Sequence, residues 1–257
     1  MKKILTAALF VILFSGCGPV PNRWENDVIV ITPIPTATMP PEPVETVELP
    51  PTIEATASVL DEPFFLDEFS SALQPGWEWR NEKSGEWSLS AQPGSLQINA
   101  RGGYVNLNNA SNVLLRDAPD VDFQVETRLV FNPWGSDQFA GLILYESDMN
   151  FIQAGRSYCA PLYGCVGSGL YMDIYQNGKL MLPRNAIQYN GSIVFLRLIR
   201  EGNTITFLAS TDGVGWFRHS QHTSDIPIEK IGIMTGQNLY TSPMLAVFDY
   251  FRVDILE

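Results

Sequence analysis

Basic residues, histidines and long apolar runs are scarce in this sequence, and each scarcity excludes a class of function. Lys and Arg number 16 against 28 Asp and Glu, and the formal net charge is −12. Binding to nucleic acid or anionic lipid through a basic surface is therefore not expected. His219 and His222 have a spacing that suits zinc only on a helix, and helical periodicity is close to absent, so we expect loop residues. The apolar run from Ile4 to Phe14 is well short of the roughly 20 residues that span a bilayer.

The N-terminal segment combines two lysines, that short apolar run and the sequence Leu-Phe-Ser-Gly-Cys ending at Cys17. It resembles the signal peptide and lipobox of a bacterial lipoprotein. The resemblance implies that residues 1–16 are removed and that acylated Cys17 anchors the chain in the lipid bilayer. Gly18 follows where an aspartate would favour retention at the inner membrane, so we expect an outward-facing position in the cell envelope. A plain transmembrane anchor and an ordinary secretory signal are the alternatives.

Residues 17–62 are rich in Pro, Thr, Val and Glu and cannot pack a core. Proline fixes φ and removes amide donors, which favours extended polyproline-II conformations. We interpret this segment as a stalk. At about 3.1 Å per residue it would hold the following domain up to roughly 140 Å from the bilayer.

Two further cysteines, Cys159 and Cys165, have five residues between them. An exported chain enters an oxidising compartment, so we predict a disulfide between them. A metal site would need a third and fourth ligand, which the neighbouring sequence does not offer, and two free thiols are seldom left exposed in exported proteins.

Residues 63–257 predict one all-β domain. Short runs rich in Val, Ile, Phe and Tyr alternate with Asn-Gly, Asp-Gly and Glu-Gly-Asn turns. Many short strands without intervening helices favour a two-sheet antiparallel sandwich. The clearest runs are 121–131, 139–145, 150–155, 169–176, 193–200, 204–210, 230–235 and 246–255.

Eight short blocks in this domain carry a family resemblance through their order. They are FLDEF at 65–69, WEWR at 77–80, WSL at 87–89, GSLQI at 94–98, AGLILY at 140–145, VFLRL at 194–198, STDGVGW at 210–216 and FDYF at 248–251. They resemble the C-terminal concanavalin-A-like domain of beta-xylosidases and related jelly-roll domains of secreted bacterial proteins. The resemblance implies a concanavalin-A-like or LamG-like jelly roll with a bias toward glycans. It does not imply hydrolysis, because this sequence has no room for the five-bladed catalytic propeller.

Catalytic carboxylates are not recognisable. Glucanases of related fold carry Glu-x-Asp-x-x-Glu or Glu-x-Asp-x-Glu on one strand, and neither pattern occurs here. The remaining pair is Glu126 and Asp173, which would have to meet across a sheet within about 5 to 10 Å. We therefore expect a protein that is not an enzyme.

A carbohydrate site is predicted on the strand at 169–176, where alternation places three apolar residues on one face and three polar or aromatic residues on the other. Aromatic rings stack on pyranose faces, and charged groups fix sugar hydroxyls. The expected ligand-binding residues are Tyr171, Asp173, Tyr175, Tyr145, Arg197, Glu126, Arg128 and Trp134. In the structural alternative the tyrosines form a half-buried second layer, the charges pair among themselves and Trp134 covers the core.

Other conspicuous residues have structural interpretations. Four tryptophans are expected to fill the sandwich, namely Trp77, Trp79, Trp87 and Trp216. Ser210-Thr211-Asp212-Gly213 is interpreted as a hairpin turn. Asp67 and Asp249 would form a structural calcium site if the first and last strands meet, although calcium takes six to eight oxygens. No other cofactor is expected.

These observations favour a surface-anchored, non-catalytic lipoprotein whose sandwich binds or positions carbohydrate. The first alternative is an envelope protein that contacts another protein, which predicts a large exposed apolar patch. The second is a diverged glycoside hydrolase, which requires the carboxylate pair described above.

Overall fold

The computed structural model describes residues 62–161, 165–181, 185–236 and 242–257. The predicted signal peptide, the predicted lipidation site Cys17 and the predicted stalk up to residue 61 lie outside the described residues. The chain divides after Ala57, and all described residues belong to the unit Ser58–Glu257. Within the described ranges, no helix has the length and apolarity needed to cross a membrane.

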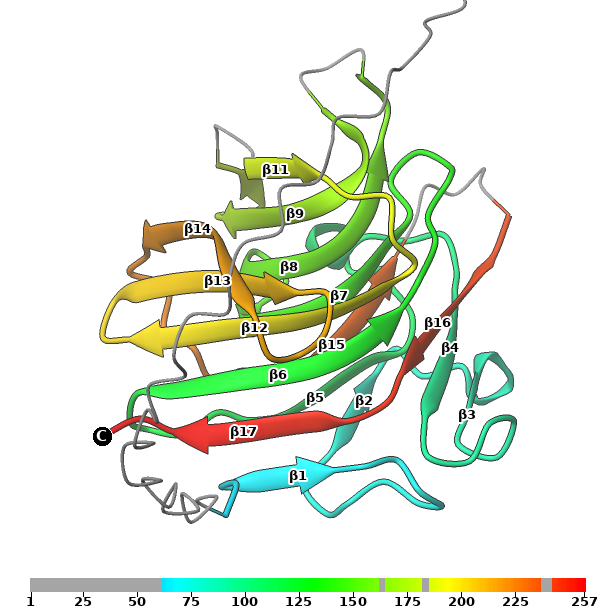
Figure 1. Ribbon diagram of the computed structural model, residues 1–257, viewed down its shortest axis with the longest axis horizontal. Helices are drawn as coiled ribbons and strands as arrows, with labels where there is room; N and C mark the ends of the chain where they lie inside the picture. The colour runs from blue at the N-terminus through cyan, green and yellow to red at the C-terminus, as the bar shows by residue number, and fades with distance from the viewer. Residues whose placement is uncertain (1–61, 162–164, 182–184, 237–241) are drawn as a thin grey trace, which may run out of the picture. The chain divides into compact units, whose positions relative to one another are not determined.

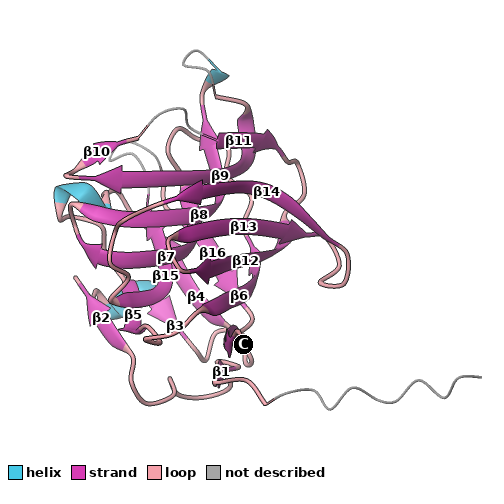
Figure 2. Cartoon of the chain, turned by 90° about the vertical axis from the view of Figure 1, so that its left-hand side faces the viewer, coloured by secondary structure: helices cyan, strands magenta, loops and turns pink. Residues whose placement is uncertain are grey.

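Two antiparallel sheets form a sandwich, which confirms the predicted fold class (Figures 1 and 2). Sheet A contains β1 (Phe65–Asp67), β3 (Trp87–Ser88), β4 (Leu96–Ala100), β6 (Phe123–Val130), β12 (Ile193–Glu201), β13 (Thr204–Ser210), β14 (Trp216–Thr223), β16 (Met244–Phe248) and β17 (Phe251–Ile255). Sheet B contains β2 (Glu78–Arg80), β5 (Val113–Asp117), β7 (Phe139–Ser147), β8 (Asn150–Cys159), β9 (Gly167–Gln176), β10 (Lys179–Leu180), β11 (Asn185–Gln188) and β15 (Lys230–Gly236). Two short 3-10 helices, η1 (Ser84–Glu86) and η2 (Val105–Leu107), complete the described elements.

The strand order brings distant segments of the chain together. Sheet A runs β14-β13-β12-β6-β16-β4-β3, with β17 pairing to both β6 and β1. Sheet B runs β10-β9-β8-β7-β15-β5-β2, with β11 pairing to β9. The first and last described strands, β1 and β17, thus lie side by side (Figure 1).

Alternating apolar side chains from both sheets fill the space between them. Val125 and Leu129 on β6 face Leu142 on β7 and Leu170 on β9, and all four are fully buried. Burying a side chain of this size contributes about 1.5 to 3 kcal/mol, so this layer is the main source of the sandwich's stability.

Most of the predicted strands are confirmed within a few residues. The predicted run at 246–255 is two strands, because the chain breaks at Asp249 and Tyr250 between β16 and β17. The prediction for His219 and His222 was wrong, because both lie on β14. The hairpin at Asp212 is confirmed, since its carboxylate accepts hydrogen bonds from the amides of Val214 (2.8 Å) and Gly215 (2.9 Å).

Strands β7, β8 and β9 bend along their length (Figure 1). Gly141 on β7 pairs with Gly155 on β8. A Cβ atom on Gly141 would lie 2.2 Å from the carbonyl oxygen of Ala154, and one on Gly155 would lie 2.2 Å from that of Ala140. Only glycine permits the two backbones to approach in this way.

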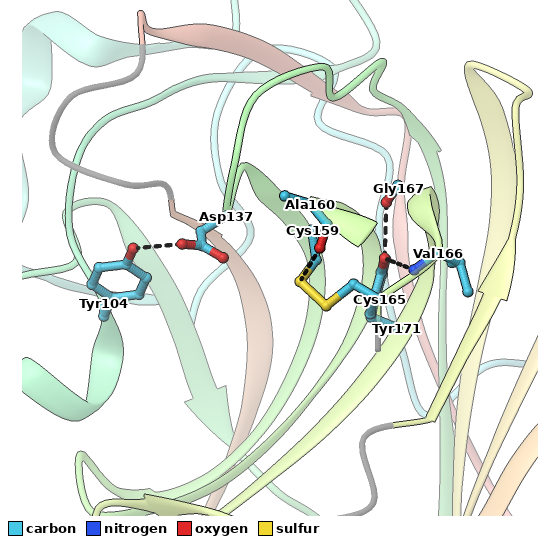
Figure 3. Close-up of a disulfide and its surroundings, with 8 residues drawn as sticks. All are labelled: Tyr104, Asp137, Cys159, Ala160, Cys165, Val166, Gly167 and Tyr171. Carbon is cyan, nitrogen blue, oxygen red and sulfur yellow. Dashed lines mark hydrogen bonds between the residues drawn. A yellow bond between two sulfur atoms is a disulfide. The ribbon is translucent and has the colours of Figure 1, made fainter. Parts of the chain in front are cut away.

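The predicted disulfide between Cys159 and Cys165 is confirmed, with Cα atoms 5.4 Å apart (Figure 3). It joins the end of β8 to the residues just before β9. Beside it, Tyr171 donates a hydrogen bond to the Gly167 carbonyl (2.8 Å) and accepts one from the Val166 amide (3.2 Å). The disulfide and the two hydrogen bonds of Tyr171 together fix the chain where it enters β9.

Candidate functional site

The outer face of sheet B, which points away from sheet A, carries a grid of side chains fixed by strand register. On β9 it presents Tyr171, Asp173 and Tyr175, as alternation predicted. Across β8 these residues pair with Gly155, Gln153 and Phe151, and across β7 the row continues with Gly141, Ile143 and Tyr145. In the row of Tyr171 the neighbouring positions on β8 and β7 are both glycine, and larger side chains occupy the other two rows.

A second apolar cluster covers part of this face. Val105, Ala110 and Val113 pack there with Phe139, Ile143 and other buried side chains. The chain around η2 approaches itself closely at Gly103, which has φ 148°, and a Cβ there would be 2.2 Å from the Asn109 carbonyl oxygen. The backbone amide of Tyr104 also donates to the Asn109 side chain (2.8 Å).

A small pocket of about 40 Å³ opens between this segment and the sheet. We call it the sheet B pocket. It is lined by Gly103, Tyr104, Val105, Asn106, Asp137, Phe139, Phe151, Gln153, Ser157, Asp173, Tyr175, Met234 and Gly236. The pocket combines aromatic rings, amide and hydroxyl groups and two carboxylates.

One wall of the sheet B pocket is made by neighbouring strands β8 and β9. The Tyr175 ring stacks on the Phe151 ring, with centroids 4.6 Å apart and planes within 13°. Beside them Asp173, which is 4% exposed, accepts a hydrogen bond of 3.1 Å from the Gln153 amide. An aromatic surface therefore lies next to a fixed carboxylate.

The opposite wall is made by Tyr104 and Asp137, which belong to segments outside the strands. The Tyr104 hydroxyl donates to the Asp137 carboxylate at 3.1 Å (Figure 3). Burial raises the pKa of Tyr104 above its usual value, and the charge of Asp137 raises that pKa further. The Tyr104 hydroxyl thus stays protonated at neutral pH.

The segment before β7 is held in place by the buried side chain of Gln138. Its oxygen accepts hydrogen bonds from the amides of Trp134 (2.9 Å) and Gly135 (3.0 Å). The Asp137 amide donates to the Tyr158 carbonyl (2.7 Å), and Asp137 has φ 61°, a conformation that aspartate tolerates better than most residues. The Asp137 carboxylate is thereby presented to the pocket by a constrained backbone.

The four predicted residues on sheet B take different positions. Asp173 and Tyr175 line the pocket, whereas Tyr171 is 1% exposed and bonded to the backbone near the disulfide. Tyr145 shares the outer face, and its hydroxyl donates to Asp148 (2.9 Å) instead of lining the pocket. Burial raises the pKa of Tyr145, with the Asp148 hydrogen bond as the next cause.

Glu126, Arg128 and Arg197 do not lie near this face, and the prediction that they neighbour Tyr171 and Asp173 was wrong. They project from β6 and β12 on the outer face of sheet A. Glu126 and Asp173 therefore point away from each other across two sheets that pack about 10 Å apart. They do not form the carboxylate pair that a glycosidase requires.

On sheet A these charges pair among themselves, as in the structural alternative. Arg197 donates to Glu126 through Nε at 2.9 Å, and the Tyr250 hydroxyl donates to the same carboxylate at 2.6 Å. Arg128 forms an ion pair with Asp249. An open hollow of about 510 Å³ lies beside this network, lined in part by Glu126, Tyr250 and Arg252. Three of its ionic groups, Glu126, Asp249 and Arg252, already have protein partners.

The tryptophans divide between the core and the surface. Trp77, Trp79 and Trp87 pack against the core as predicted. The prediction for Trp216 was wrong, because its ring lies 4.0 Å from the Arg197 guanidinium on the outer face of sheet A. Trp134 is 61% exposed, so it is not a lid over the core.

The two acids considered for calcium have other contacts. Asp67 accepts hydrogen bonds from the Phe69 amide (2.9 Å), the Gln74 amide (2.8 Å) and the Trp77 indole (2.8 Å). Asp249 faces Arg128. Among the residues that the structure describes, no group of three or more His, Cys, Asp or Glu is arranged to hold a metal ion.

The lining residues that the sequence did not identify include Tyr104, Asp137, Phe151 and Gln153. Phe151 and Gln153 are two positions apart on β8, as Asp173 and Tyr175 are on β9. The period of two therefore predicts that Phe151 and Gln153 share one face of their strand. Only strand pairing shows that the two strands are neighbours. Asp137 lies in the turn-rich segment that contains Trp134, and nothing local connects that segment to Tyr104.

The fold and the strand order described above are those of a concanavalin-A-like sandwich. Residues 66–254 match the beta xylosidase C-terminal concanavalin A-like domain, and the chain belongs to this family. No match was found among curated protein sequences.

Solved structures with this fold include larger enzymes. The GH43 protein BlXynB from Bacillus licheniformis is 19% identical, with a TM-score of 0.66 over 74% of this chain and 39% of that chain. Xylan beta-1,4-xylosidase from Bacillus halodurans C-125 is also 19% identical, with a TM-score of 0.61 over 74% and 38%. The chain thus spans well under half the length of these proteins. A beta-glucanase from Bacillus licheniformis, 11% identical, matches with a TM-score of 0.53 over 75% of this chain and 98% of its own.

Proposed function

We propose that this chain is a non-catalytic, surface-anchored lipoprotein whose sandwich binds or positions carbohydrate at the sheet B pocket. The observation that carries the proposal is the Phe151–Tyr175 stack next to the Asp173 carboxylate. An aromatic surface beside fixed polar groups suits a pyranose, whose apolar face stacks while its hydroxyls hydrogen-bond. Membership of a family named for a xylosidase domain supports the same ligand class.

A binding role suits the pocket better than hydrolysis. Glycoside hydrolysis needs the glycosidic bond between two carboxyl groups. The sheet B pocket does contain Asp137 and Asp173, but about 40 Å³ holds only a few water-sized groups and not a glycosidic linkage with its two rings. The sugar would therefore lie at the mouth of the pocket.

Anchoring through Cys17 is part of the proposal and has its own test. Cells would be fed a fatty-acid analogue, and the chain would be compared with a Cys17→Ser variant. Acyl labelling and recovery with the membrane fraction are expected for the wild type and not for the variant. Equal recovery without label would replace the lipid anchor with another mode of attachment.

Carbohydrate binding would be tested with the full-length chain in detergent on a glycan array and with insoluble polysaccharides. Tyr175→Ala removes the stacked ring, and Trp216→Ala removes an aromatic ring from the other outer face as a matched control. Binding to one sugar class that is lost only in Tyr175→Ala would support the proposal. No binding across the panel would contradict it and favour the alternative of an envelope protein partner.

A further inference from the structure

One end of the sheet B pocket is formed by a row of residues across three neighbouring strands. Ser157 on β8 pairs with Phe139 on β7, and Phe139 pairs with Gly236 on β15. All three residues line the pocket, and Met234, two positions before Gly236, is a further lining residue. The strand register thus combines a hydroxyl side chain with two large apolar side chains in the lining.

Glycine residues determine how the chain closes this end of the pocket. Gly236 and Gly103 both line it, and a Cβ atom on Gly236 would lie 2.9 Å from the Gly103 carbonyl oxygen. A side chain at Gly236 would therefore displace the segment that includes η2. This part of the boundary is main chain and not a flexible side chain, so we expect the pocket to be preformed.

The Ser157 hydroxyl is a buried polar group without a partner among the described residues. Ser157 is 8% exposed and lines the pocket. Its main chain pairs with Phe139 on one side and Gly169 on the other, but no described residue hydrogen-bonds to its hydroxyl. Buried hydroxyl groups are nearly always hydrogen-bonded, because an unsatisfied one is unfavourable. A ligand hydroxyl in the pocket would supply the missing partner.

The volume of the pocket limits the group that can enter. One water needs roughly 10 to 15 Å³ of such a cavity, so about 40 Å³ holds a substituent of two or three non-hydrogen atoms. Among common substituents of a sugar ring, a hydroxyl alone leaves most of this volume empty, and an acetamido group exceeds it. A hydroxymethyl group, which is one carbon and one oxygen, fits.

The lining also suits both atoms of a hydroxymethyl group. Phe139 and Met234 are buried and offer apolar surface to its carbon. The Ser157 hydroxyl can donate a hydrogen bond to its oxygen or accept one from it. Gln153 donates its amide nitrogen to Asp173 (3.1 Å), and its carbonyl oxygen is a further acceptor in the lining.

We infer that the sheet B pocket takes the hydroxymethyl group of a hexopyranose, with the Ser157 hydroxyl as its hydrogen-bond partner and the sugar ring at the mouth. This inference rests on the proposed function and adds a substrate class to it, namely glycans built from hexoses such as glucose, galactose or mannose. It separates this chain from the ligand that the family's name suggests, because xylose has no carbon substituent at the corresponding ring position.

The test compares cellotetraose with xylotetraose by calorimetry on the full-length chain in detergent. The two oligosaccharides have the same β-1,4 linkage and the same length, and they differ in the hydroxymethyl group of each ring. We expect cellotetraose to bind at least about tenfold more tightly, since a pocket that fits one added group discriminates to this extent. If the glycan array identifies a hexose glycan of another linkage, the same comparison uses that glycan and its 6-deoxy form.

Two substitutions at Ser157 separate the hydrogen bond from the space. Ser157→Ala removes the hydroxyl and should reduce the preference for the hexose form about fivefold. Ser157→Val adds volume inside the pocket, so it should abolish the preference and leave the affinity for xylotetraose unchanged. Ser192→Ala removes an exposed serine hydroxyl that does not line the pocket, and it should keep the preference.

The outcomes distinguish the inference from the proposed function. Equal affinity for the two forms, or tighter binding of the xylose form, would overturn the inference and leave carbohydrate binding intact, whereas failure of every glycan would contradict the proposed function itself. A preference that persists in Ser157→Val, or that falls equally in Ser192→Ala, would place hexose recognition outside the pocket. Tighter binding of a β-1,4-linked glucuronic acid oligosaccharide than of cellotetraose would assign the pocket to a carboxylate and overturn the inference as well.

A second comparison keeps the test valid if the Ser157 variants do not fold. The 6-deoxy analogue of the bound hexose keeps the substituent's carbon and loses its oxygen. With the wild-type chain, its affinity should lie between the affinities of the hexose and pentose forms. An affinity equal to that of the hexose form would contradict the hydrogen bond to Ser157.

Discussion

The Tyr175 ring stacks on the Phe151 ring at a centroid distance of 4.6 Å, although the two residues are 24 positions apart in sequence. Phe151 is fully buried in the second apolar cluster, and Tyr175, its partner on the neighbouring strand, is partly buried against it. The stack therefore joins one buried ring to one partly exposed ring. This division of roles gives different expectations for the two residues.

Replacement of Phe151 should cost far more stability than replacement of Tyr175. Phe151→Ala leaves a cavity and is expected to lower the free energy of unfolding by about 3 to 5 kcal/mol. Tyr175→Ala loses mainly the stacking contact and should cost about 1 kcal/mol. Urea denaturation of both variants measures the difference. Equal losses would make Tyr175 a core residue and remove it as a ligand platform.

Gly141 should tolerate no side chain. In Gly141→Ala the new Cβ would meet the backbone oxygen of Ala154 at 2.2 Å, and backbone atoms of a sheet cannot move aside cheaply. We expect a loss of about 1 to 3 kcal/mol in the free energy of unfolding. The control is Gly85→Ala, where nothing lies within 4 Å of the added Cβ, and a change within about 0.5 kcal/mol is expected. Similar losses in the two variants would contradict the close approach of β7 and β8 at Gly141.

Glu126 is expected to stabilise the outer face of sheet A and to have no part in ligand binding. Glu126→Gln removes the charge that faces Arg197 and should lower the free energy of unfolding by about 1 to 3 kcal/mol. Glu201→Gln, at the exposed end of β12, is the matched control and should change it little. Glycan affinity of Glu126→Gln should equal that of the wild type. A loss of affinity without a loss of stability would return Glu126 to the candidate site.

The alternation of apolar and polar residues along a single strand predicted correctly which residues share a face. It could not predict which strands pair with each other. The outward set on β9 was identified from its own sequence, because a strand exposes every second residue whatever its neighbours are. Whether Glu126 lies next to Asp173 depends on which sheet each strand joins, and this is decided by contacts between residues far apart in the chain. Tyr145 was placed on the correct face and Arg197 was not, although both lie on strands of similar composition.

Features that depend on residues close together in the chain could be predicted from the sequence. The hairpin at Asp212 and the disulfide between Cys159 and Cys165 each depend on residues within a few positions of one another. The sheet B pocket depends on Tyr104 and Asp137, which are 33 residues apart and meet only because the segment around η2 folds onto sheet B. A single sequence carries no sign of such a contact.

His219 should make the stability depend on pH. Its Nε2 donates a hydrogen bond of 3.0 Å to the Leu170 carbonyl, and its ring packs on Phe207 at a centroid distance of 4.7 Å. Burial lowers the pKa of His219 below its ordinary value of about 6.5, against a smaller opposite effect of the Leu170 hydrogen bond.

The unfolded chain therefore takes up a proton on His219 at a higher pH than the folded chain does. This contribution to stability is fully present above about pH 6.5 and is lost as the pH falls from there through the lowered folded-state pKa. Urea midpoints measured at about pH 7.5 and 5.5 should fall for the wild type and fall less for His219→Gln, which cannot titrate. An equal fall in both proteins would show that other groups, and not this buried imidazole, cause the acid sensitivity.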